Sequence, residues 1–272
     1  MSDSGGLRDI APIRRVLAWR WVARLASTRT LARLVDASLR FGLRELGGAR
    51  RMAAYRVRGL GARVVVRHNS TDVWTLNEVF HLRSYDAPPA VAMRLSSLGR
   101  PPRVLDLGAN VGMFGAMVCA RHPGAEIVAF EPDPRNAAAH RRCMELNGTP
   151  PGWELVEACA ASRDGVRPFL ATGDDSAHVV PEGAGAAVAA RDVLPLMEAS
   201  DLVKIDIEGS EWELLGDPRF GAAPAVVLEY HPGGCPTADP HAEAERLLGG
   251  AGYKVQSVYR MPSGLGVVWA WR

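Results

Sequence analysis

Asp106 and the glycine turn that follows it, Gly108-Ala109-Asn110-Val111-Gly112, have the residue types of a ligand-binding loop. The turn lies between the apolar run Val104–Leu107 and an apolar segment at helical spacing, which predicts a strand, a tight loop and a helix N-terminus. Gly108 and Gly112 lack a Cβ, so the backbone can approach a ligand closely. We expect open amides at the helix start, which favour an anionic group. The Asp106 carboxylate instead suits a ligand with a positive amino group.

Glu131 ends the next predicted strand, Glu126–Phe130, where an acid can accept hydrogen bonds from both hydroxyls of a ribose. The glycine turn does not match G-x-G-x-x-G, so the usual dinucleotide fingerprint is missing. Near the end of the chain, Tyr253–Tyr259 and Leu265–Trp271 flank Pro262-Ser263-Gly264, which predicts an antiparallel strand pair. This combination favours S-adenosylmethionine over a nicotinamide cofactor.

Asp206 and His231 lie at the ends of two further predicted strands, Leu202–Ile207 and Ala225–Tyr230. Ligands of an open parallel sheet bind at the carboxyl ends of its strands. Methyl transfer to an aliphatic hydroxyl requires removal of a proton, so a general base is useful. His231 is the first candidate, because an unperturbed imidazole titrates near neutrality. Asp206 is the second, as a base or as an anchor for the cofactor's ammonium or the acceptor's hydroxyl. In the structural alternative, His231 is bonded to the neighbouring loop.

The acids Asp206, Glu208 and Glu211 could together hold a hard cation such as Mg²⁺. Glu211 and Glu213, however, also suit a helix N-terminus, where acidic side chains interact favourably with the helix dipole. We therefore assign no metal, and we place Glu208 beside His231 and Asp206 in the candidate catalytic set.

The elements that must position these residues alternate between strands and helices. The chain has 272 residues, 47% of them hydrophobic, which suits one large globular domain with an appendage. Strand, helix, strand, helix predicts an α/β fold with a mostly parallel sheet and right-handed crossovers. We expect the main domain over residues 103–272, a lead-in segment over 61–102 and an arginine-rich helical extension over 1–60.

Several further elements follow from local patterns. We expect a strand at Arg63–Arg67, a helix at Asp72–Leu82 and a third core strand at Glu154–Ala160. Val166–Leu170 reads as a short returning strand. Ala171–Ala190 is small, polar and glycine-rich, which is typical of a surface loop.

Arginine is crowded at the start of the chain, where few acids accompany it. The residues are Arg8, Arg14, Arg15, Arg20, Arg24, Arg29, Arg33, Arg40, Arg44, Arg50, Arg51, Arg56 and Arg58. From Ile10 to about Leu46 the pattern is helical. This region is either a helical cap with a solvated basic face, or a basic amphipathic helix that touches a membrane surface or an anionic partner. The whole chain carries only +2, so a strongly anionic partner such as nucleic acid is not expected. Homo-oligomerisation is left open.

The compartment predicted from the sequence is the cytoplasm. None of the four cysteines, Cys119, Cys143, Cys159 and Cys235, forms a C-x-x-C pair, which favours reduced thiols. The N-terminus is polar and has no signal-peptide pattern, and no apolar stretch is long enough to span a bilayer.

Four ordered segments resemble the FkbM-type methyltransferase family: V-L-D-L-G-A-N-V-G, V-A-F-E-P-D-P, V-K-I-D-I-E-G-S-E and V-V-L-E-Y-H. The upstream segment E-V-F-H-L-R-S-Y is also similar, and the resemblance covers about Val73 to Arg272. It implies a class I methyltransferase fold, S-adenosylmethionine as donor and, usually, O-methylation of a sugar or natural-product hydroxyl. The arginine-rich helices and Ala171–Ala190 match no shared motif, so we expect them to shape acceptor binding.

The resemblance also implies roles for individual residues. The loop residues would line the methionine and ribose side, Glu131 would hold the ribose, Ala160 would lie by the adenine and Asp206 near the reacting methyl. The full predicted cofactor set is Tyr85, Asp106, Gly108, Ala109, Asn110, Gly112, Phe114, Glu131, Pro132, Ala160 and Asp206.

The sequence therefore predicts an S-adenosylmethionine-dependent O-methyltransferase that acts on a small-molecule or glycosyl hydroxyl. Two alternatives stay open. One is a nicotinamide oxidoreductase on a Rossmann-like sheet, and the other is a catalytically silent binding protein with the same fold.

Overall fold

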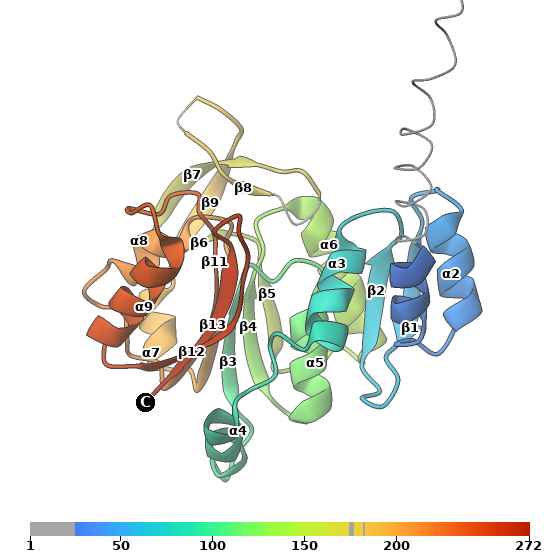
Figure 1. Cartoon of the computed structure of the whole chain (residues 1–272), viewed down its shortest axis with the longest axis horizontal. Coiled ribbons are helices and arrows are strands. Elements are labelled where there is room, and N and C mark those ends of the chain that lie inside the picture. Colours follow the sequence, from blue (N-terminus) through green and yellow to red (C-terminus); the bar gives the residue numbers. More distant parts are fainter. Residues whose placement is uncertain (1–24, 174–176, 182) are drawn as a thin grey trace, which may run out of the picture.

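A seven-stranded sheet forms the centre of the computed structural model, which describes residues 25–173, 177–181 and 183–272 (Figure 1). Its strand order is β12-β13-β11-β10-β3-β4-β5. The five central and edge strands from β11 to β5 are parallel, whereas β13 is antiparallel to both β11 and β12. The strands are β3 (Arg103–Leu107), β4 (Glu126–Phe130), β5 (Trp153–Val156), β10 (Leu202–Ile205), β11 (Ala225–Tyr230), β12 (Lys254–Arg260) and β13 (Gly266–Trp271). The predicted α/β fold with a C-terminal antiparallel pair is confirmed.

Helices cover both faces of this sheet (Figure 1). Successive residues of a strand point to opposite faces, so Val104 packs in one apolar cluster with α5 and α6, and Leu105 packs in another with α7 to α9. Asp133 and Asp239 cap α6 and α9 by accepting backbone N–H bonds, as predicted. The helices are α4 (Pro89–Ser96), α5 (Met113–Arg121), α6 (Pro134–Leu146), α7 (Leu194–Glu198), α8 (Glu211–Leu215) and α9 (Pro240–Gly250).

Ser210 and Glu213 have the spacing of a capping box at the start of α8, but they do not form one. Ser210 makes no side-chain cap bond there. Glu213 instead accepts hydrogen bonds from the Ser162 hydroxyl and the Arg167 guanidinium. The side chain therefore ties α8 to a neighbouring sheet.

That second sheet replaces the surface loop predicted for Ala171–Ala190. It has the order β6-β9-β7-β8, with β6 (Cys159–Ala161), β7 (Gly165–Leu170), β8 (His178–Val179) and β9 (Ala186–Asp192). The alanine-rich sequence of β9 has weak strand propensity, but its backbone pairs with β6 on one side and β7 on the other. The predicted third strand also divides here, because β5 pairs with β4 whereas β6 pairs with β9.

The N-terminal extension is only partly helical. Residues 25–32 and α2 (Ser38–Leu46) are helical, and an isolated bridge between Val35 and Val57 lies in the break between them. The strand β1 (Met52–Arg56), which the sequence reading missed, pairs antiparallel with the predicted strand β2 (Arg63–Arg67). The Ile10–Arg24 part of the predicted helical region lies outside the described residues. The division at residues 60 and 102 stays a prediction.

The segment predicted as one helix over Asp72–Leu82 changes its hydrogen-bonding pattern midway. It begins as α3 (Asp72–Leu76) and continues as a π-helical segment, η1 (Asn77–Leu82). Such π-turns occur often at functional sites. Within the described chain, no helix combines the length and the apolar character that crossing a bilayer requires.

Two glycines in helices allow a matched test of packing. A Cβ on Gly115 of α5 would lie 2.4 Å from Cζ2 of the buried Trp153, whereas a Cβ on Gly42 of α2 would meet nothing within 4 Å. We predict that Gly115→Ala lowers the free energy of unfolding by about 1–3 kcal/mol through overpacking. Gly42→Ala should raise it by up to about 1 kcal/mol through helix propensity. Urea unfolding measures both, and a Gly115→Ala protein as stable as wild type would contradict this packing.

Candidate active site

Two cavities adjoin at the carboxyl ends of β3, β4, β10 and β11. The smaller has a volume of about 60 Å³ and the larger about 350 Å³. They share four lining residues: Gly108, Asn110, Asp206 and Glu208. A ligand could therefore extend from one cavity into the other along the glycine turn.

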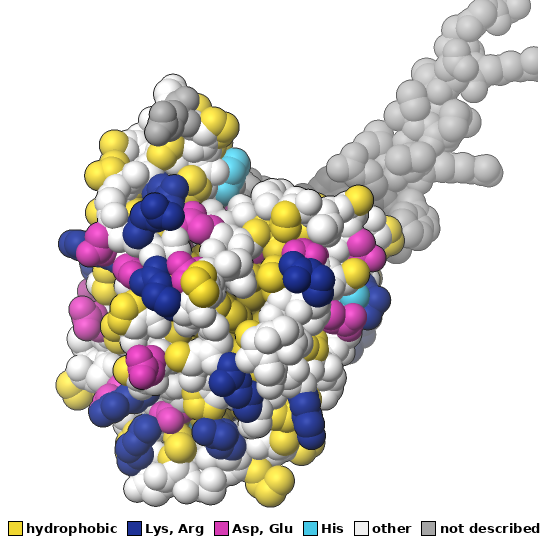
Figure 2. Space-filling view, turned by 90° about the vertical axis from the view of Figure 1, so that its left-hand side faces the viewer, with side chains coloured by type: hydrophobic (Ala, Val, Ile, Leu, Met, Phe, Trp, Pro, Cys, Tyr) yellow, Lys and Arg dark blue, Asp and Glu magenta, His cyan; other side chains and the backbone are white. Residues whose placement is uncertain are grey.

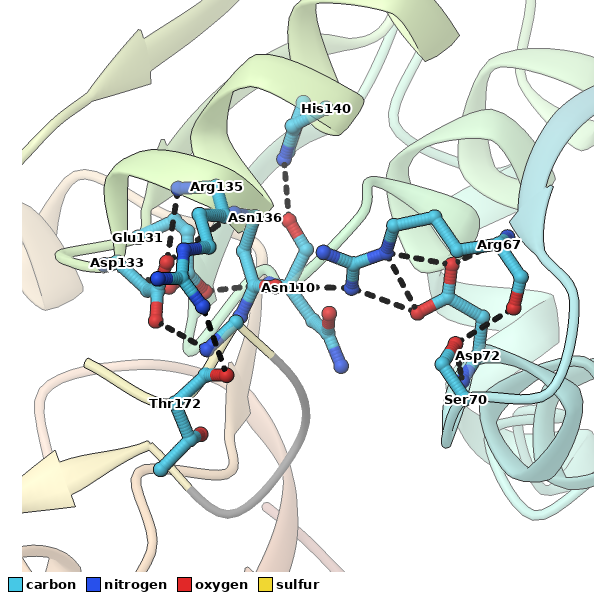
Figure 3. Close-up of polar contacts among 11 residues, drawn as sticks. Arg67, Ser70, Asp72, Asn110, Glu131, Asp133, Arg135, Asn136, His140 and Thr172 are labelled. Carbon is cyan, nitrogen blue, oxygen red and sulfur yellow. Dashed lines mark hydrogen bonds and ion pairs between the residues drawn. The ribbon is translucent and has the colours of Figure 1, made fainter. Parts of the chain in front are cut away.

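Glu131 is the buried acid of the smaller cavity (Figure 3). Its carboxylate accepts the backbone N–H of Asn110 at 2.7 Å and that of Asp133 at 2.9 Å. Burial raises the pKa of Glu131 to about 7, although these two backbone hydrogen bonds lower it. The rest of the wall is largely apolar: Phe130, Pro132, Ala160, Phe169, Val179 and Ile207.

The first backbone N–H groups of the glycine turn donate hydrogen bonds to other parts of the protein. Gly108 and Ala109 both donate to the carbonyl of Phe130, and Asn110 donates to Glu131. These three amides precede the start of α5 and are already used by the end of β4, so the open amides predicted for the helix start stay a prediction. The turn is consequently less suited to a phosphate than a helix start with free N–H groups.

Gly108 is required by close packing between strand ends. Its φ is +78°, and a Cβ would lie 1.6 Å from the backbone oxygen of Asp206. No other residue type fits that space without moving the turn. The contact fixes the turn after β3 against the residue that follows β10.

Lys204 forms ion pairs with two acids near this contact, Asp206 and Asp106. Its Nζ lies 3.1 Å from Asp206 Oδ2 and 3.5 Å from Asp106 Oδ1, and it donates to the carbonyl oxygen of Gly108 at 2.8 Å. Burial acts to lower the pKa of Lys204, but the two carboxylates raise it above the usual lysine value. Burial raises the pKa of Asp106 to about 6, against the effect of Lys204.

Two predicted cofactor residues do not line either cavity. Asp106 is fully buried behind the turn, where it faces Lys204. Gly112, with φ +82°, packs against the ring of His140 at the start of α5. In this structure the two residues support the turn from behind, and the ligand contacts predicted for them stay predictions.

The other predicted residues meet as expected. Tyr85, Ala109 and Phe114 line the larger cavity, and Pro132, Ala160 and Glu131 line the smaller one. Gly108, Asn110, Asp206 and Glu208 lie between them, and His231 faces the larger cavity. The ligand roles of these residues stay predictions.

His231 is held between carboxylates. Its Nε2 lies 3.3 Å from Glu208 Oε2, and its Nδ1 lies 3.2 Å from Oε1 of the buried Glu211. Burial acts to lower its pKa, but the Glu211 hydrogen bond and the nearby acids raise it to about 10. This arrangement favours the imidazolium form of His231, which cannot accept a further proton. Its predicted role as a base would require loss of that proton first.

Glu78 and Glu229 are the site residues that the sequence reading missed. Both line the larger cavity, where Tyr259 donates to Glu78 Oε1 at 2.6 Å and Tyr85 donates to Glu229 Oε2 at 2.8 Å. Burial, then repulsion from Asp206 and Glu78, raises the pKa of Glu229 well above its usual value. The signal was available, since both residues lie within segments that carry the family resemblance.

The acids weighed as metal ligands from the sequence differ from the side chains that the structure brings together. Ligand atoms of Asp206, Glu229 and His231 lie within 4.8 Å of one another. Lys204 and the His231 imidazolium already supply positive charge to this group. We assign no metal to it.

A half-buried arginine connects the smaller cavity to the N-terminal region (Figure 3). Arg67 of β2 makes a two-pronged contact with Asp72, and its Nη2 donates to Asn136 Oδ1 at 2.8 Å. Asn136 lines the cavity next to Glu131. Asp72 was expected to cap its helix through its side chain, but that carboxylate is used by Arg67 instead.

Sequence comparisons match this chain to methyltransferases. The family model for the methyltransferase FkbM domain matches residues 106–255. The methyltransferase sdnD of Sordaria araneosa is 29% identical over 92 residues, which are 34% of this chain and 32% of that protein. The chain thus aligns with about a third of that relative's length.

Solved structures of low sequence identity are also similar. The methyltransferase FkbM of Methylobacillus flagellatus is 14% identical, with a TM-score of 0.45 over 92% of this chain and 59% of that one. A SAM-dependent methyltransferase of Agrobacterium tumefaciens is 10% identical, with a TM-score of 0.47 over 81% and 70%.

The raised pKa of Glu131 makes a prediction for the protein without ligand. The folded state holds this proton more tightly than the unfolded chain, whose glutamate pKa is 4.5. The resulting stabilisation is complete below about pH 4.5 and is lost as the pH rises through about 7. Its full size is about 3 kcal/mol.

Glu131→Gln should remove this part of the pH dependence. Urea unfolding at about pH 5 and about pH 8 measures the difference. Glu126→Gln, an exposed change at the other end of β4, serves as the control and should keep the wild-type slope. An unchanged slope in Glu131→Gln would contradict the burial argument.

Proposed function

The chain belongs to the FkbM methyltransferase family, and from this premise we propose that it is an S-adenosylmethionine-dependent O-methyltransferase. Its acceptor is a hydroxyl of a sugar or another natural-product small molecule. The observation that carries the proposal is the pair of adjoining cavities, one suited to a nucleoside and one lined by carboxylates and aromatic rings.

The smaller cavity fits the nucleoside part of the donor. Glu131 offers a carboxylate for the ribose hydroxyls, and Phe130, Ala160 and Ile207 provide apolar surface for an adenine. Asn110 and Asp206 lie where this cavity opens into the larger one, so they would lie beside the sulfonium end. When bound, this cofactor supplies a methyl group on a positively charged sulfur.

The larger cavity suits a hydroxyl-rich acceptor. Carboxylates of Glu78, Glu208 and Glu229 can accept hydrogen bonds from hydroxyl groups. Trp74, 64% exposed, and Tyr259 add aromatic surface to the same wall. These carboxylates and aromatic surfaces would together direct one hydroxyl of the substrate toward Asp206. Positioning alone can supply much of the rate enhancement.

Glu229 is the residue we propose to take the acceptor's proton. Its raised pKa makes it a stronger base than an ordinary carboxylate, and Tyr85 orients it by donating to one oxygen. As the acceptor oxygen takes up the methyl group that the bound donor would supply, the hydroxyl proton would pass to Glu229. The charged side chains around the reacting groups would then be those of His231, Asp206 and Glu208. The competing assignment makes His231 or Asp206 the base.

The cofactor assignment can be tested by calorimetry with S-adenosylhomocysteine and, separately, with NAD. We predict binding of the first alone, and a loss of affinity of roughly tenfold or more in Glu131→Ala, because a charged hydrogen bond to the ribose is removed. Glu126→Ala on the same strand is the control and should bind normally. Binding of NAD alone would support the nicotinamide alternative instead.

The base assignment can be tested once methyl transfer is detected by mass spectrometry across a panel of glycosides and polyols. Glu229→Gln should lower kcat by roughly 100-fold or more and remove the rise in rate with pH, with S-adenosylhomocysteine affinity preserved. His231→Gln should keep that rise. If Glu229→Gln keeps the rise in rate with pH and His231→Gln removes it, His231 is the base. Donor binding without turnover on any acceptor would favour the catalytically silent binding protein.

A further inference from the structure

The charges of this chain are divided sharply along its length. The first 70 residues hold 15 of the 32 basic residues but only four of the 30 acidic ones. The remaining 202 residues therefore hold 17 basic and 26 acidic residues. The near-neutral total thus hides a strongly basic N-terminal region attached to an acidic main domain. Such an asymmetry favours contact with an anionic surface.

On the side of the main domain seen in Figure 2, basic and acidic side chains are interspersed. Ion pairs of the main domain include Arg219 with Asp192 and Arg246 with Glu243. In the described part of the N-terminal region, the two acids both have partners. The carboxylate of Glu45 lies 3.0 Å from His68 Nδ1, and Asp36 accepts the backbone N–H of Arg56.

Helix α2 lies at the edge of the molecule far from β12 and is fixed by one face (Figure 1). On that inner face Phe41 is fully buried and meets the rings of Tyr55 and His68 edge-on. Glu45, one turn further along, bonds to His68. The inner row therefore holds the helix in place without help from its outer row.

The outer row of α2 is apolar although it faces solvent. Leu39 is 77% exposed and Leu43, one turn later, is 65% exposed. Residues four apart in a helix lie side by side, so the two leucines form one patch. Arg50 and Arg51, which follow α2 in the chain, are also exposed, whereas the Arg40 guanidinium donates to the carbonyl of Ala54 and lies over the Tyr55 ring. Exposed leucines with exposed arginines close to them in the chain are typical of elements that lie in a membrane interface.

We propose that the outer face of α2, defined by Leu39 and Leu43, docks the protein on an anionic lipid surface. The leucines enter the headgroup region, and the surrounding arginines interact with anionic lipid headgroups. Nucleic acid would use the arginines but gains nothing from two exposed leucines, so a bilayer is the better match. This surface lies outside both cavities and does not depend on the proposed reaction.

Vesicle flotation of the full chain tests this proposal. We expect binding to phosphatidylcholine vesicles that contain phosphatidylserine, little binding to phosphatidylcholine alone, and weaker binding as salt is raised. Leu39→Ser with Leu43→Ser should reduce the bound fraction by about tenfold, with the thermal midpoint and S-adenosylhomocysteine affinity unchanged. Met93→Ser, at a methionine of α4 that is 70% exposed, is the matched control and should bind as wild type does.

Arg50→Glu with Arg51→Glu provides a second variant with the leucines intact, and it should also lose binding. The proposal is overturned if wild type does not bind anionic vesicles, or if either double variant binds them normally. It is also overturned if the leucine variant unfolds at a clearly lower temperature, because the chain itself would then cover these residues. Binding of a short RNA that outcompetes the vesicles would assign the basic surface to nucleic acid.

Discussion

The contact between the turn after β3 and the residue after β10 is the constraint on which the site depends. Gly108 lies so close to the Asp206 backbone that a side chain there is excluded. Lys204 ties the same two segments together through the Gly108 carbonyl and the carboxylates of Asp206 and Asp106. A buried charge is tolerated only when it is paired with an opposite charge. Replacing Lys204 or one of its carboxylate partners would therefore leave a buried charge unpaired. Both cavities are lined in part by Gly108 and Asp206, the residues of this contact.

The charge balance of the larger cavity depends on which carboxylates contact its cationic side chains, Lys204 and His231. Lys204 is shared between Asp206 and Asp106, and the His231 imidazolium between Glu208 and Glu211. Glu78 and Glu229 instead accept hydrogen bonds from tyrosine hydroxyls. Burial and repulsion from Asp206 raise the pKa of both acids. These two acids therefore hold a proton more tightly than an ordinary carboxylate does.

Much of the fold was predictable because local signals and tertiary structure agree. The apolar strands, the caps Asp133 and Asp239 and the terminal strand pair all follow from sequence patterns. β9 was not predictable, because its alanines acquire strand structure only by pairing with β6 and β7. For the site, sequence placed Glu131 and Asp206 at strand ends, but it could not show that Asp106 faces inward to Lys204. Nor could it show that His231 is held protonated by acids from another loop.

The central claim is that one donor molecule spans both cavities, with its nucleoside at Glu131 and its sulfur near Asp206. A crystal structure with S-adenosylhomocysteine tests this most directly. We predict that both ribose hydroxyls lie within hydrogen-bond distance of the Glu131 carboxylate and that the sulfur faces the cavity lined by Glu229. A nucleoside bound elsewhere, or a sulfur turned away from that cavity, would contradict the account.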